Sequence, residues 1–172
     1  MTDTALHPML TQRNIAAAAL IVGVATILGA YGFQYIGGYQ PCELCYAQRL
    51  PYYWALPVLA VLVLGWQRIP RSVRLIATLL ALAIFAWGAW MGGFHAGVEW
   101  GWWPGPTSCT GPGLGTDFSG LSDLNQTKIV PCDVAQWRFL GISFAGYNGL
   151  ISALIVVLCG ASAFRQFRNI GR

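Results

Sequence analysis

The sequence predicts an all-α membrane protein: a four-helix transmembrane bundle with two extracytoplasmic loops and both termini in the cytoplasm. Hydrophobic residues make up 56% of its 172 residues and charged residues 9%, a composition typical of membrane proteins. Four stretches are long or apolar enough to cross a hydrocarbon core about 30 Å thick. Most of the basic residues fall at those ends of the stretches that would share one side of a membrane.

The four apolar stretches cover approximately residues 15–33, 50–66, 75–94 and 140–164. Because lipid cannot satisfy backbone polar groups, these stretches are expected to be helices. We therefore expect residues 1–172 to form a single transmembrane domain. A cleaved signal peptide is the alternative for the first stretch, since Arg13 precedes it. That stretch is longer than a usual signal core, and no clear small-x-small cleavage site follows before Cys42.

The basic residues predict the orientation of the bundle. Seven of the ten Lys and Arg residues fall on one side of the predicted membrane, namely Arg13, Arg68, Arg71, Arg74, Arg165, Arg168 and Arg172. The positive-inside rule assigns this side to the cytoplasm. They occupy a terminus, a turn and a tail without interleaved aromatic residues, so we expect contact with membrane lipid and no nucleic-acid binding. The opposite side receives the two connections, approximately residues 34–49 and 95–139.

Four of the five cysteines lie in those outer connections, where disulfides persist. They are Cys42, Cys45, Cys109 and Cys132. Their order along the chain suggests pairing Cys42 with Cys45 and Cys109 with Cys132, but four cysteines allow three pairings and the sequence does not choose. Cys159 falls within the last apolar stretch and is expected to be a packing residue.

The segment CELCYAQR, residues 42–49, places a CxxC pair beside an arginine. A three-residue step on a helix puts Cys42 and Cys45 on one face, where their sulfurs can close a strained ring. Pro41 suits a helix start, and the free N–H groups there stabilise a thiolate. Arg49 lies on the same helical stripe, so its charge favours the thiolate further.

Three alternatives apply to these residues. Arg49 could instead extend its charge to the lipid headgroups from a helix end. The four outer cysteines could hold a structural zinc ion, although such sites usually draw on two close ligand pairs and only one is present. They could also form static disulfides that staple a loop rich in Gly and Pro.

The longer outer connection begins with a histidine and a carboxylate. His95 and Glu99 are four residues apart, so they share a face if the preceding helix continues for one more turn. Such a pair can relay protons or hydrogen-bond a carbonyl ligand, since histidine titrates near neutral pH. The alternative is a solvated residue at a helix end. From Trp103 to Asp133 periodicity is weak, apart from an amphipathic piece at 118–124, and a loop of this length is usually mobile or functional.

Taken together, these features resemble the bacterial disulfide bond formation protein B family. The resemblance rests on the four spans, the CxxC followed by an arginine, the outer histidine, the two loop cysteines and the stretch PCDVAQWRFLGISFAGYN. It implies a protein-disulfide:quinone oxidoreductase in the bacterial inner membrane, with its redox loops facing the periplasm. Such an enzyme reoxidises a periplasmic thiol oxidase of the thioredoxin fold, a DsbA-like protein, and passes electrons to the membrane quinone pool.

The resemblance also implies a set of site residues. The catalytic set is Cys42, Cys45, Cys109 and Cys132, with the first two proximal to the quinone and the last two facing the partner. The cofactor-binding set is Arg49, His95 and Glu99, although the best-known family members carry glutamine at the position of Glu99. The implied cofactor is ubiquinone or menaquinone, and no metal is required.

The implied reaction is a series of disulfide exchanges. The partner's thiolate attacks Cys109 and releases Cys132, which attacks Cys42 and leaves Cys45 as a thiolate beside the quinone. Arg49 would stabilise negative charge on a quinone oxygen. Two further functions stay open. A vitamin K epoxide reductase-like enzyme would carry its CxxC late in the chain, whereas a membrane scaffold would hold static disulfides.

Overall fold

Long helices dominate the computed structural model, which describes residues 3–110 and 130–168. The helices are α1 (Asp3–Tyr35), α2 (Glu43–Ala47), α3 (Leu50–Leu64), α4 (Arg71–Glu99) and α5 (Phe144–Arg168). Four helical segments are long and apolar enough to cross a membrane: Thr11–Tyr35, Glu43–Leu64, Arg71–Glu99 and Phe144–Arg168. The predicted fold class, a membrane bundle of four helices, is confirmed. The amphipathic piece expected at 118–124 lies outside the described residues.

Several helix boundaries differ from the sequence-based ones. α1 begins at Asp3, because the polar residues before the apolar run continue the same helix. α4 ends at Glu99, so the outer connection begins after this residue and not at residue 95. α5 begins at Phe144 instead of residue 140, because a hairpin precedes it.

This hairpin pairs β1 (Arg138–Phe139) with β2 (Ile142–Ser143) in antiparallel orientation. The two residues at its turn, Leu140 and Gly141, have φ values of 48° and 82°. Two consecutive positive φ values are typical of the tight turns that match the twist of a two-stranded ribbon. The sequence around Leu140 is apolar enough to be taken as the start of a span, which explains the misplaced boundary.

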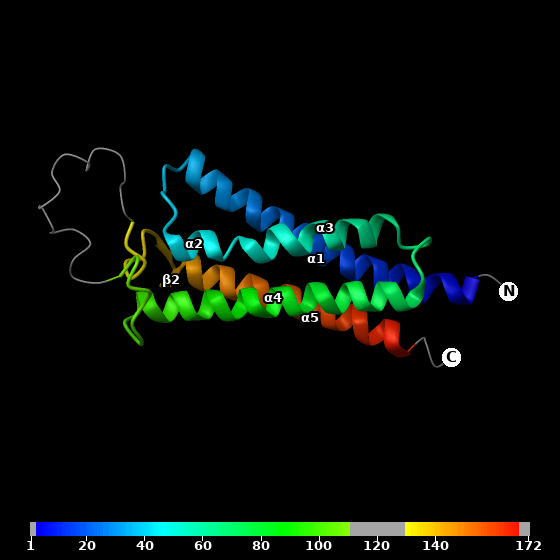
Figure 1. The fold of residues 1–172 in the computed structure, drawn as a ribbon. Helices are drawn as coiled ribbons and strands as arrows, with labels where there is room; N and C mark the ends of the chain where they lie inside the picture. Colours follow the sequence, from blue (N-terminus) through cyan, green and yellow to red (C-terminus); the bar gives the residue numbers. More distant parts are fainter. Residues whose placement is uncertain (1–2, 111–129, 169–172) are drawn as a thin grey trace, which may run out of the picture.

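The elements divide between the two ends of the bundle (Figure 1). The start of α1, the turn between α3 and α4 and the end of α5 lie at one end. α2, the hairpin and the segment after α4 lie at the other. Every described cysteine except Cys159 belongs to this second end.

Helices α4 and α5 pack closely through glycine. A Cβ atom built on Gly92 would lie 2.5 Å from the backbone of Gly149, closer than such atoms approach in proteins. Small residues at such a contact let two membrane helices approach backbone to backbone. The contact lies one turn before His95, and thereby fixes this part of α4 against α5.

The outward-facing surface of the bundle is apolar. Large hydrophobic side chains are exposed on every long helix, among them Ile21, Val61, Ile76 and Val157. In water such a surface would be an aggregation liability, whereas in a bilayer the lipid chains cover it.

Candidate functional site

The CxxC pair lies at the start of α2. Cys42 is the N-cap residue, and its Sγ accepts a hydrogen bond from the backbone N–H of Cys45 at 3.2 Å. The two sulfur atoms are 2.6 Å apart, and both cysteines are free. The contact with the Cys45 sulfur and burial raise the pKa of the Cys42 thiol well above its ordinary value. Cys42 therefore keeps its proton at neutral pH.

The two loop cysteines form a disulfide. Cys109 and Cys132 have an S–S distance of 2.06 Å and a Cα–Cα distance of 5.4 Å. Both are buried, and they share one apolar cluster with Cys42 and Leu44. The structure thus brings all four outer cysteines to one place, although 63 positions separate Cys45 from the next of them along the chain.

His95 lies between the two cysteine pairs. Its Nε2 is 3.7 Å from the Sγ of Cys42 and 3.1 Å from the carbonyl oxygen of Cys132. Because α4 continues to Glu99, the carboxylate shares a face with the imidazole, and Glu99 Oε1 is 3.9 Å from His95 Nε2. Ser143, at the end of the hairpin, donates its hydroxyl hydrogen bond to Glu99 Oε2. His95 and Glu99 are therefore part of the packed site and not solvated residues at a helix end.

Arg49 lies where α2 meets α3 and is 8% exposed. Its guanidinium donates a hydrogen bond of 2.6 Å to Gln34 Oε1 and lies over the rings of Tyr31 and Tyr46, at 5.2 and 5.3 Å from their centroids. No carboxylate pairs with it among the residues that the structure describes. A buried cation held by aromatic faces and one amide keeps most of its charge for a further partner.

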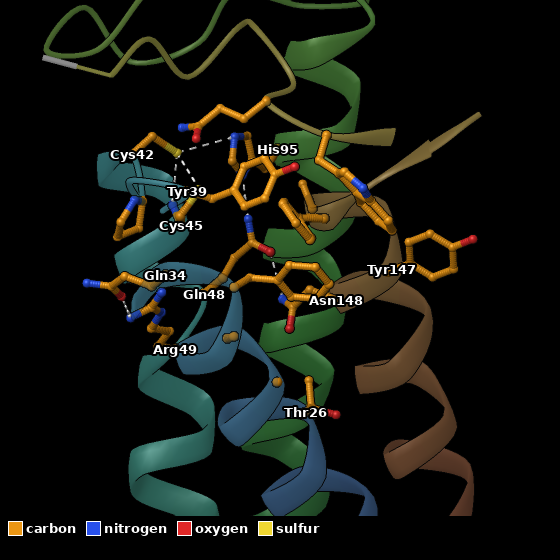
Figure 2. Close-up of a pocket in the computed structure, with 18 of the residues that line it drawn as sticks. Thr26, Gln34, Tyr39, Cys42, Cys45, Gln48, Arg49, His95, Tyr147 and Asn148 are labelled. Atoms are coloured by element: carbon orange, nitrogen blue, oxygen red, sulfur yellow. Dashed lines mark hydrogen bonds between the residues drawn. The ribbon is translucent and has the colours of Figure 1, made fainter. Parts of the chain in front are cut away.

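A cavity of about 430 Å³ adjoins these groups. Five of the predicted site residues line it, Cys42, Cys45, Arg49, His95 and Glu99, and Figure 2 shows the first four of them. Much of its remaining wall comes from the facing surfaces of α1 and α5, for example Ile27, Phe33, Phe144 and Ile151. Cys109 and Cys132 do not line the cavity, although the carbonyl of Cys132 contacts His95, which does. The site combines a thiol pair and a cation with a largely apolar chamber.

Comparisons with known proteins decide the family. The model of the family described as "Disulfide bond formation protein DsbB" matches residues 12–162. The chain belongs to the disulfide bond formation protein B family. It is therefore a multi-pass membrane protein with an oxidoreductase role in disulfide bond formation. This assignment favours the predicted family over the vitamin K epoxide reductase-like alternative.

Curated relatives named "Disulfide bond formation protein B" cover most of the chain. The protein from Albidiferax ferrireducens is 25% identical over 166 residues, which is 91% of this chain and 90% of that protein. The protein from a Polaromonas species is 27% identical over 157 residues, 85% of this chain and 87% of that protein. The one from Hahella chejuensis is 28% identical over 149 residues, 81% and 86% respectively. No solved structure gives a significant match.

Three donors of the site are also close enough to hold a metal ion. The ligand atoms of Cys42, Cys45 and His95 lie within 4.8 Å of one another, a set suited to a thiophilic ion. This cluster is not the four-cysteine zinc site considered from the sequence, because the sulfurs of Cys109 and Cys132 are bonded to each other.

Sequence reasoning missed three polar residues of the site. Gln34 holds Arg49, and Gln48 connects His95 to Asn148. Gln48 lies within the quoted CELCYAQR segment, and Asn148 interrupts an apolar span. A polar residue inside a membrane span is a signal of function in its own right, and this signal could have found Asn148.

Cys159 lies outside the site, in the core formed by α1, α3, α4 and α5. We expect Cys159→Ala to leave disulfide formation unchanged and to lower the free energy of unfolding by about 1 kcal/mol, since one buried atom is lost. Measuring oxidation of a reduced partner protein beside thermal unfolding in detergent tests this. Loss of activity in a folded variant would place Cys159 in the redox set.

Proposed function

We propose that this protein generates disulfide bonds for a periplasmic DsbA-like thiol oxidase and passes the electrons to a membrane quinone. The observation that carries the proposal is the junction of two cysteine pairs with an apolar cavity. Cys109 and Cys132 pack against Cys42, and Cys42 and Cys45 line a cavity that also contains Arg49. Electrons can therefore enter on one side of this junction and leave on the other.

The cavity suits a quinone by its chemistry. A quinone has a flat ring with two carbonyl oxygens and an apolar tail, and the cavity offers apolar walls with a few polar groups at one edge. Arg49 would donate to one carbonyl oxygen and His95 would lie near the ring, while Glu99, which also lines the cavity, would accept a proton. When bound, ubiquinone or menaquinone supplies a two-electron acceptor.

The thiol steps follow from which sulfurs are neighbours. The partner's thiolate attacks Cys109, and the released Cys132 thiolate attacks Cys42 of the Cys42–Cys45 disulfide, so that Cys45 leaves as a thiolate. The second thiolate of the partner then attacks its mixed disulfide, which oxidises the partner and releases Cys109. The Cys109 thiolate then attacks the sulfur of Cys132 in the Cys132–Cys42 disulfide. This step re-forms the Cys109–Cys132 disulfide and releases Cys42 as a thiolate.

The dithiol that results matches the described arrangement, in which Cys109 and Cys132 are joined while Cys42 and Cys45 are free. Two electrons and two protons then leave this pair for the quinone, and the Cys42–Cys45 bond is restored. The raised pKa of Cys42 supports the assignment of the negative charge to Cys45, which lines the cavity together with Cys42.

We further propose the bacterial inner membrane as the location, with both termini in the cytoplasm and the two connections, the one after α1 and the one after α4, in the periplasm. Six described arginines support this orientation because they belong to the start of α1, the turn after α3, the first turn of α4 and the end of α5. Those segments share one end of the bundle (Figure 1). Basic side chains there would bind anionic lipid.

The test is anaerobic incubation of the purified protein with a reduced DsbA-like oxidase and ubiquinone, in which the reduction of ubiquinone is monitored by its absorbance. We expect one quinone to be reduced for each partner disulfide formed, with the same rate after metal chelation. If no quinone is consumed and all four outer cysteines stay oxidised, the protein is a scaffold with static disulfides. Loss of the rate on chelation would instead assign a metal to Cys42, Cys45 and His95.

A further inference from the structure

A chain of three polar side chains runs from the buried His95 into the bundle. Gln48 Nε2 lies 2.5 Å from His95 Nδ1, and Asn148 Nδ2 lies 2.7 Å from Gln48 Oε1. The hydroxyl of Tyr52 donates to Asn148 Oδ1 at 2.7 Å. Figure 2 shows Gln48 between His95 and Asn148. The chain joins α4 to the end of α2, then to α5 and α3, so the fold positions each link independently.

The carbonyl oxygen of Cys132 fixes the direction of this chain. It lies 3.1 Å from His95 Nε2 and can only accept a hydrogen bond, so in the neutral ring Nε2 carries the proton. Nδ1 is then the nitrogen with the lone pair and accepts from the Gln48 amide. Gln48 must therefore turn its oxygen to the amide of Asn148, whose own oxygen faces Tyr52. In this arrangement each of the three hydrogen bonds of the chain joins a donor to an acceptor.

The same Nε2–H group, whose shortest contact is the Cys132 carbonyl oxygen, also lies near a redox-active sulfur and the Glu99 carboxylate. Cys42 Sγ lies 3.7 Å from His95 Nε2, within the range of a hydrogen bond to sulfur. In the exchange steps proposed above, Cys42 leaves as a thiolate when Cys109 attacks Cys132 and re-forms the Cys109–Cys132 disulfide. A hydrogen bond to a charged acceptor is stronger than one to a neutral acceptor, so a donor held there favours the departure of Cys42.

We propose that Gln48, Asn148 and Tyr52 are positioning residues that hold His95 as its neutral Nε2–H tautomer, aimed at the Cys42 sulfur. The tautomer follows from hydrogen-bond geometry alone, whereas its effect on turnover rests on the proposed function. None of the three needs to touch the partner or a reacting sulfur to act. Together with the Cys132 carbonyl, which accepts from Nε2, they keep the proton on that nitrogen of His95.

The decisive variant is Asn148→Asp, which changes one functional group and no atom in contact with His95. A carboxylate at position 148 accepts from Tyr52 and also from Gln48, so the Gln48 amide must turn over and present its oxygen to Nδ1. We therefore expect Nδ1 to become protonated. Tyr52→Phe, which removes only the terminal hydroxyl, frees Asn148 to turn and should give a mixture of both tautomers.

Nitrogen-15 NMR of histidine-labelled protein reads the tautomer directly, in the form with reduced Cys42 and Cys45. The chain has two histidines, so a His7→Gln background leaves one imidazole. We expect a bare Nδ1 and a protonated Nε2 in the parent protein, and a protonated Nδ1 after Asn148→Asp. Gln34→Glu is the matched control, because it adds a carboxylate to the same cavity beside Arg49 and should leave the tautomer unchanged.

Turnover provides the second measurement. Loss of one hydrogen bond to a charged sulfur predicts a kcat about tenfold lower for Asn148→Asp, with a KM for quinone changed by less than about twofold. A protonated Nδ1 in the parent protein, or an unchanged ring after Asn148→Asp, would overturn the inference. Absence of quinone-dependent turnover in the parent protein would instead overturn the proposed function, and would leave the tautomer result standing.

Discussion

Replacing Cys132 with serine should abolish quinone-dependent turnover and leave the partner oxidase covalently attached to Cys109. Without Cys132 no neighbouring thiolate can carry electrons from the loop pair to Cys42, so the pathway ends at the first exchange. Cys109 and Cys132 are joined and buried beside Cys42, which makes this interruption complete. Non-reducing gel electrophoresis after mixing with the oxidised partner, followed by mass spectrometry, identifies the attached cysteine.

Cys109→Ser is the matched control, because it removes the same disulfide and imposes the same loss of stability, typically about 2–5 kcal/mol. It should also abolish turnover but should trap far less partner, since Cys132 is engaged with Cys42 in the proposed order. Equal trapping by both variants would contradict the assignment of Cys109 as the entry point. Full activity of either variant would remove the loop pair from the reaction.

Local sequence features predicted the fold and part of the site. The apolar stretches required helices because lipid leaves no other partner for the backbone. The spacings within CELCYAQR and between His95 and Glu99 are helical spacings, which determine neighbours within one or two turns. Cys42 and Cys45 do meet at the start of α2, and His95 and Glu99 do share the end of α4, whereas α2 ends at Ala47 and Arg49 is the N-cap residue of α3.

Contacts between helices were beyond such reasoning. Gln48 and Asn148 are 100 positions apart, and their hydrogen bond depends on how α5 is placed against the end of α2. The partner of Arg49 is on α1, 15 positions before it, and no periodicity connects the two. The start of α5 was misplaced for another reason: a two-residue turn with positive φ at Leu140 has no strong sequence signal beyond the following glycine.

Arg49→Ala should raise the KM for quinone by about tenfold to a hundredfold, the effect expected when a hydrogen bond to a charged group is lost. The guanidinium is buried at the polar edge of the cavity without a carboxylate partner among the described residues. Its charge is therefore available to a carbonyl oxygen that gains electron density on reduction. Steady-state kinetics at varied ubiquinone concentration measure this, while partner trapping by Cys132→Ser in the same background should be unaffected.

Arg49→Lys separates charge from shape. A lysine keeps the positive charge but not the planar fork, which holds Gln34 while it rests between two tyrosine rings. We expect an intermediate KM, several-fold above the parent value, because an ammonium group in this position loses its stacked support and retains its attraction for the oxygen. A KM for quinone that neither substitution changes would contradict the cofactor role of Arg49. Arg49 would then be a membrane anchor, because anchoring depends on charge at the lipid boundary and not on the ring-stacked geometry found here.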